Sequence, residues 1–121
     1  MPIKNVLVVD DSPTDRQHLT DILAKSGYNV TTAASAEEGI AKVRESRPDL
    51  VLMDVVLPGY NGYQATRELT RDEATRDIPV ILCTSKGQET DKVWGMRQGA
   101  RDYIVKPVNG SELLKKISAL G

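Results

Sequence analysis

The stretch Val6-Leu7-Val8-Val9-Asp10-Asp11 decides the fold, because four apolar residues run directly into two carboxylates. Such a short apolar run is typical of a strand in a parallel sheet that helices cover on both faces. The same arrangement returns where residues 50–53 end at Asp54. The carboxyl ends of parallel strands meet at one crevice of an open α/β sheet. We therefore expect the three aspartates to lie together there.

The rest of the chain repeats this unit, since short apolar runs alternate with helical patterns about five times along its 121 residues. This alternation predicts an α/β fold with a parallel sheet. The expected strands lie near residues 6–9, 30–33, 50–53, 79–83 and 103–105. The expected helices lie near residues 13–25, 35–46, 63–71, 89–98 and 109–120.

Local signals mark several of these boundaries. Ser12-Pro13 provides an N-cap followed by proline in the first helical position. Ser35 to Glu38 reads as a capping box, and Gly99 as a left-handed helix end. The strand at 30–33 is less apolar than the others, so we expect it near an edge of the sheet.

Composition excludes several classes of function. Sixteen basic and seventeen acidic residues give a net charge of −1, so no global field favours nucleic acid. The chain starts Met1-Pro2-Ile3-Lys4 without an apolar signal segment, and its longest apolar runs are strand-sized, which predicts no membrane association. Cys83 is the single cysteine, and we expect it to be buried in a strand. A chain without disulfides fits the cytoplasm.

Three clustered carboxylates repel one another, and a small hard cation relieves that repulsion. Oxygen ligands favour Mg²⁺, and this geometry makes one aspartate a plausible nucleophile toward a phosphoryl group. Thr84 and Lys106 follow the fourth and fifth strands, where a hydroxyl and an ammonium suit phosphoryl oxygens. Each acid taken alone is more often a turn or cap residue. Lys106 could equally form a structural salt bridge to one carboxylate.

The sequence resembles the receiver domain of bacterial response regulators, of the CheY-like single-domain type. The matching stretches are distributed over the whole chain in the family's order: residues 8–12, residues 52–62, Thr84-Ser85 and residues 99–107. The resemblance implies a doubly wound, flavodoxin-like (βα)5 fold. Its sheet order would be 2-1-3-4-5, with helices on both faces.

The resemblance also implies a set of site residues. Asp54 would be the phosphoacceptor, and Mg²⁺ would be held by Asp11, Asp54 and the backbone carbonyl of Val56. Asp10 would reach the ion through water.

Further residues at this site would respond to phosphorylation. Thr84 would follow the phosphoryl group, Lys106 would pair with it, and the Lys106-Pro107 peptide would be cis. Tyr103 would rotate into space that Thr84 vacates, so that the surface of the fourth helix, fifth strand and fifth helix changes. The alternative for Tyr103 is a half-exposed ring without motion.

By the same resemblance, residues 1–121 form one receiver domain with no output domain, which is a phosphoacceptor and not an enzyme with a diffusible product. Its partners would be a histidine kinase, with a CheA-like kinase as one candidate, and a downstream protein. Residues 62–67 and 88–95 are similar to receivers of type IV pilus twitching and taxis systems, which suggests a pilus motor or taxis component downstream. We expect a monomer.

Two rival functions are open at this point, a small aspartyl phosphatase and a receiver-like module that has lost phosphorylation. Several residues also depart from the family pattern. Ser85 stands where Ala or Gly is usual, and Val56 and Lys86 occupy the two positions that modulate dephosphorylation. Val93 and Trp94 are expected in core packing or a surface patch. His18 is expected to be an exposed helix residue without a role.

Overall fold

A computed structural model describes residues 3–85 and 89–120, and side chains of residues 89–91 are not considered. Five strands alternate with five helices, as the sequence predicts. The elements are β1 (Asn5–Val9), α1 (Pro13–Lys25), β2 (Asn29–Ala33), α2 (Ala36–Ser46), β3 (Leu50–Asp54), α3 (Gly62–Arg71), β4 (Val80–Thr84), α4 (Glu89–Arg97), β5 (Asp102–Val105) and α5 (Gly110–Leu120).

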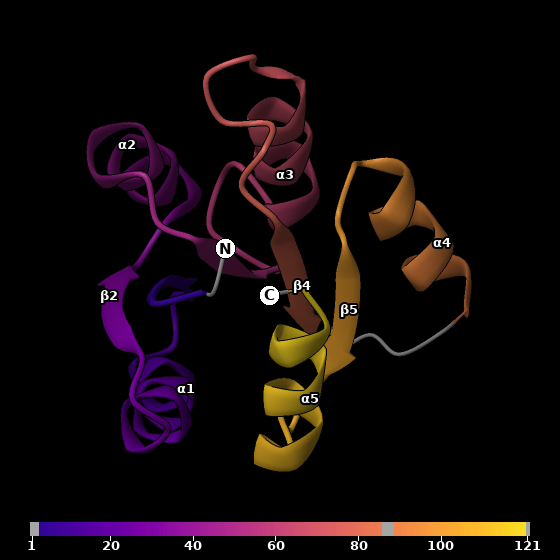
Figure 1. Ribbon diagram of the computed structural model, residues 1–121. Coiled ribbons are helices and arrows are strands. Elements are labelled where there is room, and N and C mark those ends of the chain that lie inside the picture. The colour runs from indigo at the N-terminus through magenta and orange to yellow at the C-terminus, as the bar shows by residue number, and fades with distance from the viewer. Residues whose placement is uncertain (1–2, 86–88, 121) are drawn as a thin grey trace.

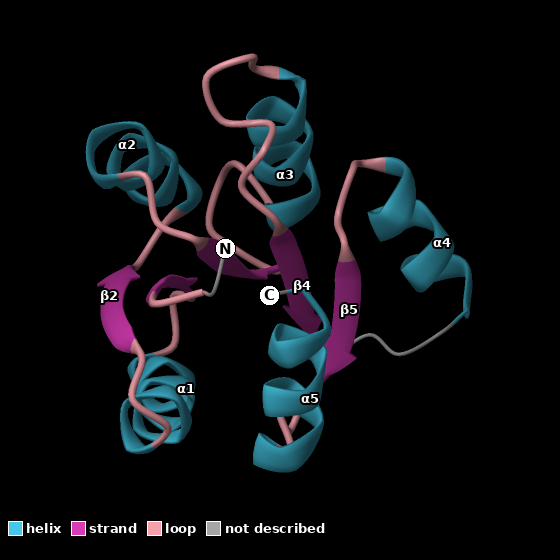
Figure 2. Cartoon of the chain, in the orientation of Figure 1, coloured by secondary structure: helices cyan, strands magenta, loops and turns pink. Residues whose placement is uncertain are grey.

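The five strands form one parallel sheet in the order β2-β1-β3-β4-β5. Helices α1 and α5 cover one face, and α2, α3 and α4 cover the other (Figure 1). Figure 2 shows the resulting three layers, with the strands between the helices. The predicted doubly wound architecture and strand order are therefore confirmed. This order makes β1, β3, β4 and β5, whose ends carry the candidate site residues, successive neighbours.

Two apolar clusters fill the space between sheet and helices, because successive strand side chains point to opposite faces. Leu7 and Val9 belong to the cluster beneath α2 and α3, whereas Val6 and Val8 belong to the cluster beneath α1 and α5. Burying one such side chain contributes about 1.5–3 kcal/mol. β2 alternates between exposed and covered positions, which agrees with its predicted place at the sheet edge.

The helix ends follow the predicted signals with one difference. The Ser12 hydroxyl accepts a hydrogen bond from the Asp15 amide, and Pro13 is the first residue of α1. The Ser35 hydroxyl accepts from the Glu38 amide, but the Glu38 carboxylate accepts from Ala34. The expected capping box at Ser35 is thus wrong in its second bond, because the Glu38 carboxylate accepts from the Ala34 amide and not from the Ser35 amide.

Cys83 is buried in β4, as predicted, and burial raises the pKa of its thiol to about 12. That thiol therefore stays protonated and unreactive at neutral pH. Within the described ranges, no helix combines the length and apolar character needed to cross a bilayer.

Candidate functional site

Asp10, Asp11 and Asp54 meet at the carboxyl ends of β1 and β3, as the sequence predicts. One carboxylate oxygen from each of the three lies within 4.8 Å of the others. Asp10 and Asp54 are 1% and 6% exposed, whereas Asp11 faces solvent. The two buried acids are held by neighbouring strands, so the cluster is built into the sheet.

Lys106, which follows β5, brings an ammonium into this acidic cluster. Its Nζ lies 2.7 Å from Asp10 Oδ2 and 3.4 Å from Asp54 Oδ1. A third carboxylate, from Asp15 in the first turn of α1, lies 3.0 Å away. Lys106 therefore forms ion pairs with three carboxylates, and not with one as the alternative interpretation assumes.

The charges at this site shift the acid–base properties of its members. Burial, followed by the nearby charge of Asp10, raises the pKa of Asp54 to about 6, against the opposing effect of Lys106. Burial works against the charged form of Lys106, but hydrogen bonds to Asp10 and Asp15 and the charge of Asp54 raise its pKa overall. Lys106 therefore stays positively charged at neutral pH. The neighbouring Asp54 lies among other negative charges, which disfavour its ionised form.

The side chain of Asp10 is fixed in position. Its Oδ1 accepts a hydrogen bond from the Ser12 amide at 2.9 Å, while Oδ2 faces Lys106. Arg16 adds a bond from its guanidinium to the Asp10 backbone carbonyl at 2.8 Å. Neither Asp15 nor Arg16 is among the site residues predicted from the sequence. An acid and a base in the first turn of the helix that follows an Asp-Asp pair are the signal that points to them.

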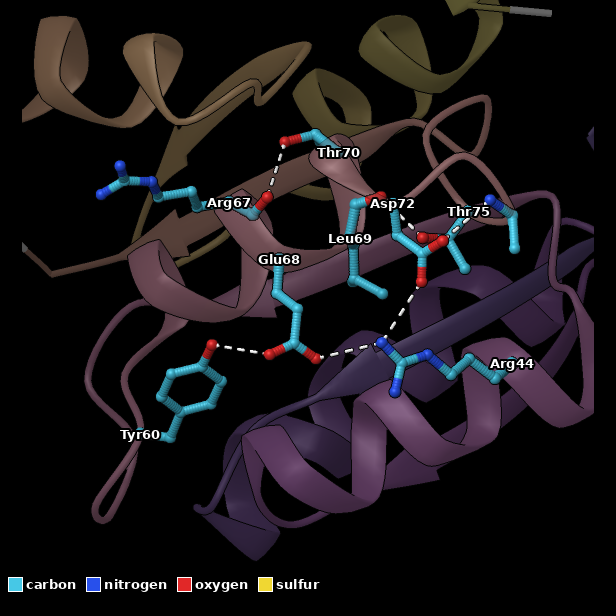
Figure 3. Close-up of polar contacts among 9 residues, drawn as sticks. Arg44, Tyr60, Arg67, Glu68, Leu69, Thr70, Asp72 and Thr75 are labelled. Carbon is cyan, nitrogen blue, oxygen red and sulfur yellow. Dashed lines mark hydrogen bonds and ion pairs between the residues drawn. The ribbon is translucent and has the colours of Figure 1, made fainter.

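The loop after Asp54 is closed by a glycine and anchored to helices α2 and α3. A Cβ on Gly62 would lie 2.0 Å from the Asp54 carbonyl oxygen, so only glycine permits this close approach. Within the loop, the Tyr60 hydroxyl donates to Glu68, and Glu68 in turn pairs with Arg44 of α2 (Figure 3). These contacts hold the backbone that follows the candidate nucleophile.

Thr84 ends β4 fully buried, and Tyr103 of β5 is 7% exposed. The expected alternative of a half-exposed Tyr103 is therefore wrong. A Cβ on Gly95 would lie 3.5 Å from the Tyr103 ring, which places that ring beside α4. The atom nearest to that Cβ would be Leu82 Cδ1, at 2.7 Å, so Gly95 makes room for Leu82, and the Tyr103 ring packs next to it at an ordinary contact distance.

The remaining predicted features differ in outcome. The Lys106–Pro107 peptide is cis, as expected. The Val56 side chain is 55% exposed at the rim of the site. Lys86 lies outside the described residues.

A family model described as "Response regulator receiver domain" matches residues 6–118. The chain belongs to this family. It is also 56% identical to Protein PilH of Pseudomonas aeruginosa over 115 residues, which cover 95% of each chain. By contrast, it spans about half the length of several transcriptional regulatory proteins to which it is 38–40% identical.

Solved receiver structures share the fold of this receiver domain. The Vibrio cholerae chemotaxis protein CheY4 is 31% identical, with a TM-score of 0.91 over 98% of this chain and 99% of its own. The receiver domain of the Pseudomonas aeruginosa sensor histidine kinase PA1611 is also 31% identical, with a TM-score of 0.88 over 96% and 95%. That structure holds a magnesium ion coordinated in its active site cleft.

The acidic cluster of this receiver domain fits a magnesium ion chemically. All of its side-chain donors are carboxylate oxygens, and one of them, from Asp11, opens to solvent. Mg²⁺ is typically bound by one or two carboxylates while it retains several waters. An exposed acid next to a buried one satisfies that requirement.

Beyond the site, the receiver domain presents apolar side chains on α4. Val93, Trp94 and Met96 are each about half exposed, so the surface-patch expectation for Val93 and Trp94 is confirmed. His18 is exposed as predicted, but it is not without contacts. Its Nε2 lies 3.0 Å from the Val108 carbonyl oxygen, which links α1 to the segment after β5.

Proposed function

We propose that this receiver domain is a magnesium-dependent phosphorylation switch, with Asp54 as the phosphoacceptor. The observation that carries the proposal is the position of Asp54. Its buried carboxylate ends β3 beside Asp10 and Asp11, with Lys106 Nζ 3.4 Å away. A nucleophile, metal-ligating acids and a cation thus converge where a phosphoryl group would bind.

In the proposed reaction, an Asp54 oxygen attacks the phosphorus of a phosphohistidine in line with the nitrogen that leaves. A new P–O bond forms as the P–N bond breaks, and the imidazole takes up a proton. Lys106 pairs with one phosphoryl oxygen, and the Thr84 hydroxyl donates to another. Asp11, Asp54 and the Val56 carbonyl would hold Mg²⁺, with Asp10 reaching it through water. When bound, the ion offsets charge on the phosphoryl oxygens.

The proposed partners are a histidine kinase, with a CheA-like kinase as one candidate, and a downstream protein. The signal would pass to the downstream protein through a contact surface formed by α4, β5 and α5. In this proposal residues 1–121 act as one domain, which is a monomer in the cytoplasm. We place this signal in pilus-based motility or taxis. Identity to PilH and the resemblance of residues 62–67 and 88–95 to type IV pilus receivers support that placement.

Incubation with acetyl phosphate, with Mg²⁺ or with EDTA, tests this function against its rivals. We expect a mass increase of one phosphoryl group that requires Mg²⁺, resists acid and is lost in base. Rapid turnover of the donor without an accumulated adduct would indicate a phosphatase. No adduct on the folded protein would indicate a module that has lost phosphorylation.

Binding of beryllofluoride, which mimics a phosphoryl group on aspartate, should perturb Thr84 and Tyr103 together. Tyr103 is already buried, so Thr84 is expected to stabilise this inward position of the ring once its hydroxyl bonds the phosphoryl mimic. The free energies of the unphosphorylated and phosphorylated conformations should differ by about a few kcal/mol at most. NMR should show shifts at Tyr103, Lys92 and Lys106. A spectrum unchanged at all three, despite bound beryllofluoride, would refute the coupling.

Val56→Asn should shorten the lifetime of the phosphorylated protein. Hydrolysis needs a water in line behind phosphorus, and the exposed Val56 side chain offers that water no hydrogen bond. We expect hydrolysis about tenfold faster in the variant, equivalent to about 1.4 kcal/mol in barrier height. The measurement follows phosphate loss after the donor is removed. Equal decay rates in variant and parent would show that Val56 does not gate the water.

A further inference from the structure

Asp15 is a fourth carboxylate at this site, and it lies outside the residue pattern that carries the family resemblance. Its Oδ2 is 3.0 Å from Lys106 Nζ, closer than the Asp54 oxygen at 3.4 Å. The start of α1 sets its position, because the Asp15 amide donates to the Ser12 hydroxyl. Asp15 therefore reaches Lys106 from a helix, across 91 positions of sequence.

Lys106 already contacts three carboxylates in the absence of a phosphoryl group, with hydrogen bonds to Asp10 and Asp15 and an ion pair to Asp54. An ammonium has three N–H donors, and Lys106 faces three carboxylates, those of Asp10, Asp15 and Asp54. A phosphoryl oxygen on Asp54 therefore competes with the hydrogen bonds of Lys106 to Asp10 and Asp15. Asp10 is the least replaceable, because it is 1% exposed and held by the Ser12 amide. The Asp15 side chain is 44% exposed, so water can solvate it once Lys106 turns away.

The charge balance points in the same direction. Three carboxylates contact the ammonium of Lys106, and a fourth, that of Asp11, belongs to the same acidic cluster, so a phosphoryl group adds further negative charge to a site that already holds four acids. Asp15 supplies one of these four charges without belonging to the cluster of three acids that could hold a metal ion. Its charge therefore opposes the incoming anion and contributes less to the binding of a cation.

We propose that Asp15 is a positioning residue that restrains Lys106 in the unphosphorylated protein and competes with a phosphoryl group for its ammonium. Asp15 thereby makes the phosphorylated state less favourable, so that a smaller fraction of the protein is phosphorylated when phosphoryl donors are scarce. This proposal rests on the proposed function of Asp54.

Beryllofluoride titrations at saturating Mg²⁺, followed by NMR, test the role of Asp15. Asp15→Asn keeps the shape of the side chain and removes its charge, so we expect about two- to fivefold tighter binding, as for one partly exposed ion pair. Asp15→Glu should restore the parent affinity. Asp21→Asn removes one charge from the same helix, where Asp21 contacts Gln17, and should change nothing.

Two further measurements separate a role through Lys106 from a general charge effect. In a Lys106→Gln background, Asp15→Asn should no longer tighten binding. Without any ligand, Asp15→Asn should shift or broaden the Lys106 ammonium resonance, whereas Asp21→Asn should not. Unchanged or weaker binding by Asp15→Asn, or tightening that persists in the Lys106→Gln background, would overturn the proposal.

The failure of the proposed function has a different signature. If the parent protein itself binds no beryllofluoride, Asp54 is not a phosphoryl site. The restraint of Lys106 by Asp15 is then still decided by the ammonium resonance, and an unchanged resonance rejects it.

Discussion

Asp54→Asn is expected to accept no phosphoryl group from acetyl phosphate, under conditions in which the parent protein is fully modified. The asparagine keeps the shape of the buried side chain, but its amide oxygen lacks the charge that makes a carboxylate nucleophilic. Asp54 is also one of three acids whose oxygens lie within 4.8 Å, so the substitution relieves repulsion and the fold should persist. Intact-protein mass after incubation measures the modification, and circular dichroism checks the fold.

Asp77→Asn is the matched control for this loss. Asp77 is an exposed aspartate outside the acidic cluster, so its variant should be phosphorylated like the parent. An undiminished adduct in Asp54→Asn would falsify the assignment of the acceptor.

Without divalent cations, the contribution of Asp54 to the free energy of unfolding should decrease as the pH rises from about 4 to above about 6. The folded protein raises the pKa of Asp54 from its ordinary value of 3.8 to about 6, mainly through burial and then through Asp10. Between these values the native state binds more protons than the unfolded state, so each increase in pH favours unfolding. The full contribution is about 3 kcal/mol, present below pH 3.8 and lost above pH 6.

Asp54→Asn isolates this contribution, because other groups titrate in the same range. Backbone hydrogen bonds from Asn5 and Lys4 lower the pKa of Asp49, so Asp49 stabilises the fold at higher pH and loses this effect as pH falls. Urea unfolding of parent and variant is therefore compared in EDTA at about pH 4 and about pH 7.5. The difference between the two proteins cancels the contributions of groups that both contain, such as Asp49. The variant should gain stability relative to the parent by about 2 kcal/mol between the two pH values. An equal difference at both pH values would show that Asp54 does not titrate abnormally.

The sheet and the acidic cluster were predictable because both depend on short-range patterns. Apolar runs that end at Asp10 and Asp54 identify two strands and their carboxyl ends, and the rule for parallel sheets places those ends together. The family resemblance supplied the order of the strands, which the structure confirms. The roles of Thr84 and Tyr103 and the binding of Mg²⁺ stay predictions.

Contacts that the sequence does not predict depend on how the helices and loops are oriented across the fold. Asp15 reaches Lys106, and His18 reaches Val108, only because of the rotation of α1 above β1 and the path of the chain after β5. Helical periodicity indicates which residues share a face but not which distant loop that face meets. The burial of Tyr103 likewise depends on how α4 packs over β5, because the ring lies against Gly95 of that helix.

The most direct measurement of the central claim is the position of the phosphoryl group in the parent protein. After incubation with acetyl phosphate and Mg²⁺, borohydride reduction converts a phosphorylated aspartate to homoserine, which peptide mass spectrometry locates. We predict a single converted residue, Asp54, and no conversion in samples incubated with EDTA. Conversion of another acid, such as Asp10 or Asp11, with Asp54 intact would contradict the account.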